Sequence, residues 1–158
     1  MKFQKLNKDL FDVKNCYYAH CISRDYALGA GIAVTFNKKY NIRNTLKLMA
    51  KDYPETLKQK CIRVDNVFNL ITKDKYWQKP TYLSLKEALI EMKESIERRI
   101  ESNEYYKKVD ERLVDNNIYK LVMPKIGCGL DKLSWDKVEP MIKEIFNDLD
   151  IEIIICYL

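Results

Sequence analysis

The sequence predicts an α/β layered domain with a mixed central sheet, because segments of strand character alternate along it with segments of helical periodicity. Residues 14–22 and 151–158 are apolar over nearly their whole length, as is expected of strands that are covered on both faces. With 158 residues, 47% of them apolar, the chain is long enough to bury a core without disulfides or a structural metal. We therefore expect a single domain over residues 1–158.

The first strand and two helices are predicted in the amino-terminal third. Residues 14–22 are rich in β-formers and lack turn residues, and a glycine-containing turn follows them. A helix is expected over residues 30–39 and a short second helix over 43–51. The apolar residues from Ile32 to Phe36 alternate with other types, so a strand is the alternative to the first helix.

A hairpin and a long helix are predicted in the middle of the chain. Residues 61–72 have the character of two strands, joined by Asp65 and Asn66, a dipeptide suited to a tight turn, and the pair ends at Lys73. From residue 84 to about 100, apolar residues recur at three- and four-residue steps, with lysines and glutamates between them. That spacing is typical of an amphipathic helix with one buried face.

The remaining elements are a surface segment, a strand, a helix and a closing strand. Residues 101–117 are polar and contain tyrosines, so irregular or helical surface structure is expected there. Strand character resumes at residues 118–123, and Ser134 stands where a helix N-cap is expected before a second amphipathic run. The final apolar run, 151–158, suits a central strand.

Charge and hydropathy narrow the class of protein. The chain has 28 basic and 23 acidic side chains, and the net charge of +5 is spread along it, which fits attraction to anionic small molecules as well as to nucleic acid. No apolar run approaches the roughly 20 residues of a membrane span, and the amino-terminal residues lack the apolar block of a signal peptide. We expect a cytoplasmic protein without a membrane partner.

Cysteine and histidine usage argues against a metal centre. The five cysteines are widely spaced and contain no C-x-x-C pattern, which disfavours a disulfide framework and a Cys-rich zinc site. The single histidine, His20, rules out a His-rich metal site, and its apolar surroundings favour a buried, hydrogen-bonded side chain. No metal and no cofactor are expected.

A glycine-rich turn between a predicted strand and a predicted helix is the most informative stretch of the chain. An apolar strand leads into Gly127-x-Gly129 and Asp131, and the capped helix follows. Glycines let backbone N–H groups approach an anion closely, and the helix N-terminus adds a favourable dipole. The alternative is a strand-to-helix turn that needs glycine only for its conformation. The spacing matches neither a P-loop nor the dinucleotide-binding fingerprint.

A second glycine turn carries Gly29 and Gly31, and it also follows a strand and precedes a helix. Two such turns at strand ends of one α/β domain can hold a diphosphate from both sides. Together they favour a nucleotide-like ligand over a purely structural role.

Several separated phrases resemble the macrodomain family, specifically the branch of the terminal ADP-ribose protein glycohydrolases. They are AHCIS-x-D at 19–25 with GAGIAV at 29–34, LITK at 70–73 with KPTY at 79–82, and MPKIGCGLD at 123–131. The resemblance implies a three-layer α/β/α fold that binds ADP-ribose in a cleft at the strand ends. It implies an adenine contact at Asp9, with Leu10 beside it, and an adenosine contact at Leu158. The other expected ADP-ribose contacts are Ser23, Gly29, Gly31, Lys125, Ile126, Gly127, Cys128, Gly129 and Leu130.

The resemblance also places a nucleophilic lysine at Lys73 and its partner acid/base at Asp131. An amine can attack the anomeric carbon of the distal ribose and expel a carboxylate, leaving a Schiff base that water resolves. A carboxylate can move the protons between ribose hydroxyl, amine and water. Without the resemblance, Lys73 would be read as one solvated lysine among many. The neighbouring Tyr76 and Trp77 either cover the core or form a wall of the cleft.

The leading hypothesis is an enzyme that removes ADP-ribose from glutamate and aspartate esters of ADP-ribosylated proteins, or from O-acetyl-ADP-ribose. One alternative is an antitoxin-like enzyme that removes ADP-ribose from nucleic acid. Another is a module that binds ADP-ribose without cleaving it. We expect the protein to be a monomer.

Overall fold

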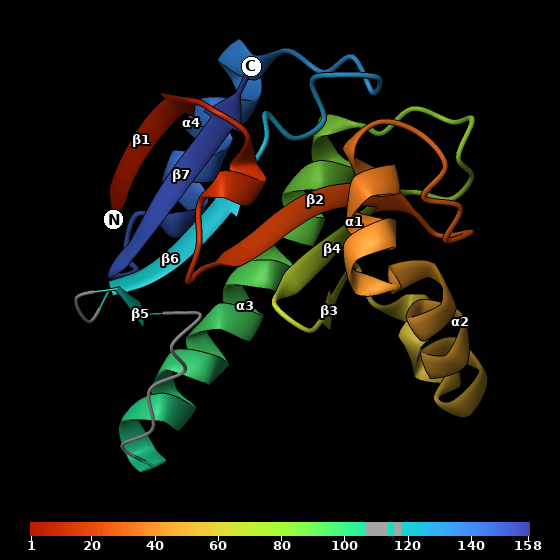
Figure 1. Ribbon diagram of the computed structural model, residues 1–158, viewed down its shortest axis with the longest axis horizontal. Helices are drawn as coiled ribbons and strands as arrows, with labels where there is room; N and C mark the ends of the chain where they lie inside the picture. Colours follow the sequence, from red (N-terminus) through yellow and green to blue (C-terminus); the bar gives the residue numbers. More distant parts are fainter. Residues whose placement is uncertain (107–113, 116–117) are drawn as a thin grey trace.

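The computed structural model describes residues 1–106, 114–115 and 118–158, and Figure 1 shows their arrangement. Within these residues, seven strands form one sheet, in the order β1-β7-β6-β2-β4-β3, with β5 paired to β6. Their bounds are β1 Lys2–Asn7, β2 Tyr17–Ser23, β3 Cys61–Val64, β4 Val67–Lys73, β5 Val114–Asp115, β6 Ile118–Met123 and β7 Ile151–Tyr157.

The sheet is mixed, as the sequence predicted. Strands β1, β7, β6, β2 and β4 are parallel to one another, whereas β3 is antiparallel to β4 and β5 is antiparallel to β6. Parallel strands end at the same edge of a sheet, so the residues that follow β2, β4, β6 and β7 meet there. The β3–β4 hairpin turns at Asp65 and Asn66, and Asp65 adopts the left-handed conformation with φ 51°.

Helices cover both faces of the sheet. Figure 1 shows α1 crossing in front of the strands, whereas α3 and α4 pass behind them. The bounds are α1 Ile32–Tyr40, α2 Ile42–Asp52, α3 Tyr82–Tyr106 and α4 Trp135–Phe146, with short 3-10 turns at Leu10–Asp12 and Pro54–Lys58. The predicted three-layer α/β/α architecture is therefore confirmed. The segment for which both a helix and a strand were considered forms a helix, α1.

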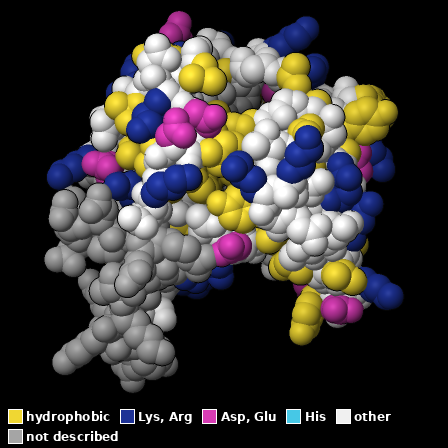
Figure 2. Space-filling model, viewed as in Figure 1, with side chains coloured by type: hydrophobic (Ala, Val, Ile, Leu, Met, Phe, Trp, Pro, Cys, Tyr) yellow, Lys and Arg dark blue, Asp and Glu magenta, His cyan; other side chains and the backbone are white. Residues whose placement is uncertain are grey.

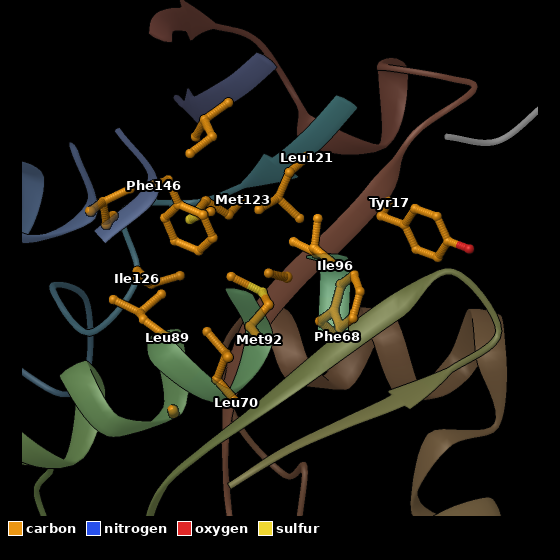
Figure 3. Close-up of a cluster of buried hydrophobic side chains, with 14 of the residues drawn as sticks. Tyr17, Phe68, Leu70, Leu89, Met92, Ile96, Leu121, Met123, Ile126 and Phe146 are labelled. Atoms are coloured by element: carbon orange, nitrogen blue, oxygen red, sulfur yellow. The ribbon is translucent and has the colours of Figure 1, made fainter. Parts of the chain in front are cut away.

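The core behind the sheet is formed by the apolar faces of α3 and α4. Figure 3 shows Leu89 and Met92 from α3, and Phe146 from α4, directed toward Leu121 and Met123 of β6. All five side chains are fully buried. The three- and four-residue spacing that predicted the helices thus corresponds to the faces that exclude water and dock them on the strands.

The core in front of the sheet is built around Phe36 of α1. Its ring stacks on the His20 imidazole, with centroids 4.1 Å apart, and contacts the ring of Phe11 at 4.8 Å. His20 is fully buried, and its Nε2 lies 2.6 Å from the Asn69 Oδ1. This confirms the prediction of a buried, hydrogen-bonded histidine. Burial outweighs the hydrogen bond with Asn69 and lowers the pKa of His20 to about 4.

We predict that acid destabilises the fold through His20. Between pH 6.5 and about 4 the unfolded chain binds a proton at this imidazole and the folded chain does not, so stability falls as the pH drops through that window. The loss reaches about 3 kcal/mol. Urea unfolding at several pH values measures it. In His20→Gln, whose amide can still form a hydrogen bond but does not titrate, the slope over this window should be smaller. An unchanged slope would contradict the assignment.

Strand β1 was not predicted from the sequence. Only Phe3 and Leu6 of its six residues are partly buried, which is too weak an alternation to indicate a strand. It forms because its backbone pairs with β7 along the whole length, from Lys2 opposite Glu152 to Asn7 opposite Tyr157. Lysines on such an edge strand discourage pairing with a second chain.

The segment predicted as polar surface, 101–117, continues α3 to Tyr106 and contains β5, while residues 107–113 and 116–117 lie outside the described part of the chain. In the described part, no helix is both long enough and apolar enough to cross a bilayer.

Candidate active site

The two glycine turns line one cavity at the carboxyl ends of the parallel strands. Figure 1 shows the loops that follow β2 and β6 at the same end of the sheet. The cavity has a volume of about 520 Å³. Ten of the residues predicted to form the site line it, namely Ser23, Gly29, Gly31, Lys73, Lys125, Ile126, Gly127, Gly129, Leu130 and Asp131.

The first glycine turn has an unusual backbone that a side chain from α2 stabilises. Leu28 has φ 45° and Gly31 has φ 61°, both in the left-handed region, which costs a non-glycine residue about 1–3 kcal/mol. The Arg43 guanidinium donates to the carbonyl of Ala27, with Nε 2.9 Å from that oxygen, and also to the carbonyl of Leu28. This charge-assisted contact offsets part of the strain and holds the wall of the cavity in place.

The second glycine turn is held by its own backbone. The N–H of Leu133 donates to the carbonyl of Gly127 at 2.7 Å, and the N–H of Lys132 donates to that of Gly129 at 3.1 Å. Gly127 has φ 73°, and a Cβ placed on it would lie 3.0 Å from a methyl of Leu133 and 3.4 Å from one of Leu85. Glycine is needed at position 127 for conformation and for space.

We predict that Gly127→Ala destabilises the protein by about 1–3 kcal/mol, since the new Cβ is strained by the positive φ and must displace the Leu133 side chain. The free energy of unfolding in urea measures this loss. Gly129→Ala is the matched control in the same turn, because a Cβ there meets nothing within 4 Å. Equal stability of the two variants would show that position 127 imposes no such requirement.

Lys73 and Asp131 form an ion pair at the edge of the cavity. The Lys73 Nζ lies 2.7 Å from the Asp131 Oδ1, and the side chains are 14% and 15% exposed. Lys73 is the last residue of β4, and a register shift between β2 and β4, which leaves Thr72 of β4 without a partner residue in β2, brings Ser23 opposite Lys73. The two residues that the family resemblance assigned to catalysis, 58 positions apart in sequence, are thus in direct contact.

Asp25 joins the segments that follow β2 and β4. Its carboxylate accepts from the Ser23 hydroxyl at 2.5 Å, from the Ala27 N–H at 3.2 Å and from the Tyr76 N–H at 3.0 Å. Burial alone would raise the pKa of Asp25, but these hydrogen bonds and the charge of Lys75 outweigh burial and lower it. Asp25 therefore holds Ser23 and Tyr76 against the cavity.

Lys79 connects the segment after β4 to the second glycine turn, because its Nζ donates to the carbonyl of Leu130 at 2.7 Å. Lys79 and Asp25 were not predicted as site residues, although both lie inside the sequence phrases that carried the family resemblance. Tyr76 and Trp77 are each 67% exposed, so they do not cover the core. Tyr76 lines the 520 Å³ cavity, as the alternative reading of these aromatics expected.

Four predicted ligand contacts lie outside the lining of the cavity. Leu10 is 5% exposed and packs in the core in front of the sheet, and Asp9 caps the 3-10 turn by accepting from the Phe11 N–H at 3.0 Å. Leu158, 94% exposed, follows the strand that pairs with β1, so it lies at the same sheet edge as Asp9. These three assignments remain predictions.

Cys128 is the fourth of these residues. Its thiol is half-buried and donates to the carbonyl of Ile126 at 3.3 Å. Burial outweighs the charge of Lys125 and raises the pKa of the Cys128 thiol, so this residue is not an activated nucleophile. In the described part of the chain, no three His, Cys, Asp or Glu residues gather as metal ligands.

Two curated proteins are similar to this chain over most of its length. The human ADP-ribose glycohydrolase OARD1 is 37% identical over 136 residues, which cover 85% of this chain and 77% of the human protein. The bovine ADP-ribose glycohydrolase OARD1 is 36% identical over 135 residues, with 85% and 76% covered. No family model matches the chain.

Solved structures with the same fold include macrodomains. The DarG macrodomain of Mycobacterium tuberculosis has a TM-score of 0.72 and 19% identity, with 99% of this chain and 97% of that chain covered. The Thermosipho africanus DarTG structure in complex with ADP-ribose has a TM-score of 0.69 and 14% identity, with 98% of this chain and 41% of that chain covered.

Proposed function

The chain belongs to the macrodomain family, and from this premise we propose that it is an ADP-ribosyl hydrolase that uses Lys73 as nucleophile and acts on esters of acidic side chains. Its curated relatives are named ADP-ribose glycohydrolases. The observation that carries the proposal is the contact between Lys73 and Asp131 at the edge of the cavity lined by the two glycine turns.

The cavity suits the diphosphate and distal ribose of ADP-ribose. Its volume of about 520 Å³ lies within the usual range for small-molecule sites. The glycine turns precede α1 and α4, so backbone N–H groups and helix N-termini are available to a diphosphate. Lys125 adds a positive charge to the lining.

The Lys73 amine forms a bond to the anomeric carbon of the distal ribose, and the bond from that carbon to the ester oxygen breaks. The electron pair stays on the leaving carboxylate. Asp131 is at hydrogen-bond distance from the Lys73 ammonium and takes the proton that the amine must lose before it attacks. The ribose ring opens to a Schiff base, water adds to the same carbon, and cleavage of the carbon–nitrogen bond releases ADP-ribose and restores Lys73.

The charge distribution supports a protein acceptor over nucleic acid. Figure 2 shows basic and acidic side chains interspersed among the described residues on the face drawn, without a continuous basic stripe. A protein that tracks a nucleic-acid backbone commonly presents such a stripe.

The test is release of free ADP-ribose from a glutamate-modified protein by the purified chain, with ADP-ribosylated single-stranded DNA as the second substrate. Release from the protein that varies little with salt supports the proposal. Release from DNA alone, with a steep loss of activity as salt rises, favours the nucleic-acid alternative. Binding of ADP-ribose with no release from either substrate, or from O-acetyl-ADP-ribose, would establish a binding module instead.

A further inference from the structure

A second cavity lies beside the first and shares the nucleophile with it. It has a volume of about 680 Å³. Lys73 and Lys79 line both cavities. The glycines of the two turns line only the first cavity, whereas Arg24, Lys60 and Trp77 line only the second. A group attached to the anomeric carbon next to Lys73 can therefore continue into a separate space with different chemistry.

We propose that this second cavity, the acceptor cavity, binds the polypeptide that carries the ADP-ribose and prefers acidic residues beside the modified side chain. The inference rests on the proposed function. It adds to that function a binding site for the protein acceptor.

Two cations give the acceptor cavity its preference for negative charge. The Arg24 guanidinium donates to the carbonyl of Gln59 at 2.5 Å, and the Lys79 ammonium donates to the carbonyl of Leu130 at 2.7 Å. Because both carbonyl groups are neutral, neither hydrogen bond offsets the positive charge of the side chain that donates it. Lys60, which like Arg24 lines only this cavity, is different because Glu87 forms an ion pair with it. Carboxylates that flank a modified glutamate would pair with Arg24 and Lys79.

The remaining lining suits a peptide backbone better than a sugar–phosphate backbone. The carboxylates of Asp74 and Glu87 and the hydroxyls of Thr81 and Ser84 line the cavity together with the cations. A peptide backbone offers both N–H donors and carbonyl acceptors to such a mixture, whereas a phosphodiester backbone offers acceptors only. Trp77, 67% exposed, provides a flat apolar surface for the peptide to cover.

The test compares three substrates. Two are peptides with one ADP-ribosylated glutamate, flanked by acidic residues in one peptide and by lysines in the other. The third is O-acetyl-ADP-ribose, which has no polymeric acceptor. We expect the wild type to have the higher kcat/KM for the acidic peptide. Arg24→Gln should lower kcat/KM for the acidic peptide about fivefold and so reduce the difference in kcat/KM between the two peptides. Its turnover of O-acetyl-ADP-ribose should stay within about twofold of the wild-type value. Trp77→Ala should lower kcat/KM for both peptides and leave kcat/KM for O-acetyl-ADP-ribose unchanged.

Matched controls are available for both variants. Arg63→Gln removes another arginine that donates to a backbone carbonyl, that of Asp65 at 2.6 Å, and does not line the acceptor cavity. Tyr53→Ala removes another aromatic of similar exposure, 69%, from the end of α2. Each control should keep the wild-type kcat/KM for all three substrates.

Three results would overturn the inference while the wild type remains active. The first is equal loss on all three substrates, which would place Arg24 and Trp77 in the ADP-ribose cavity. The second is no loss on any of them. The third is loss only on ADP-ribosylated single-stranded DNA, assayed beside these three substrates, which would assign the cavity to nucleic acid. If the wild type releases ADP-ribose from none of the substrates, the proposed function itself fails and the acceptor cavity fails with it.

Discussion

Lys73→Ala is expected to lower the rate of ADP-ribose release from a glutamate-modified protein by about a thousandfold or more. The variant lacks the amine that forms the bond to the anomeric carbon, and Asp131 then has no partner from which to take a proton. Affinity for ADP-ribose should change little, because the glycine turns remain intact. Single-turnover release, together with calorimetric titration of ADP-ribose, separates the two effects.

The matched control for Lys73→Ala is Lys75→Ala, which removes an exposed lysine two residues further along the same segment. It should retain nearly full activity. Release by Lys73→Ala at a rate close to that of the wild type would mean that the ester is cleaved without a lysine adduct, and the nucleophile would then have to be water.

Asp131→Asn is expected to lower the rate by about 10²–10⁴-fold, the range for loss of a positioned acid/base. The amide is close to the carboxylate in shape but cannot accept the Lys73 proton, and it leaves an ammonium that is only 14% exposed without its counter-ion. Any adduct that still forms should be resolved slowly, because no carboxylate assists the water. Borohydride reduction during turnover would convert that Schiff base to a stable amine, detectable as an added mass on the peptide that contains Lys73.

Asp136→Asn serves as the control for Asp131→Asn, because Asp136 is exposed, lies five residues further along the chain and lines neither cavity. Its activity should stay within a few-fold of the wild type. A trapped mass on another lysine, or full activity of Asp131→Asn, would remove the proton-transfer role from Asp131.

The elements that were predicted correctly are those whose own pattern of apolar residues indicates which of their faces are buried. In α4 the apolar spacing alone indicates the face that contacts the sheet, and in β7 the continuous apolar run indicates burial on both faces. Strand β1 lacks such a pattern, since its formation depends on backbone pairing with a strand about 150 residues away in sequence. Local sequence does not encode that partner.

Lys73 and Asp131 were predicted from a resemblance. No local pattern would have placed their side chains 2.7 Å apart, because a register shift between β2 and β4 and a glycine turn determine that distance. Asp25 and Lys79 were missed for a related reason. Each acts on backbone groups of a different segment, Tyr76 for Asp25 and Leu130 for Lys79. Partners of this kind become visible only when the fold brings the segments together.

The pairing of β1 with β7 has a consequence for how the chain acquires its structure during synthesis. The register joins residues 2–7 to residues 152–157, so β1 is paired only after about 150 further residues have been synthesised. Contacts of such long sequence separation form late, since the loop-closure entropy must be offset before they stabilise anything. Until β7 has been made, the backbone of β1 has no neighbouring strand with which to pair. A nascent or truncated chain without β7 would thus leave the backbone of β1 unpaired and open to aggregation.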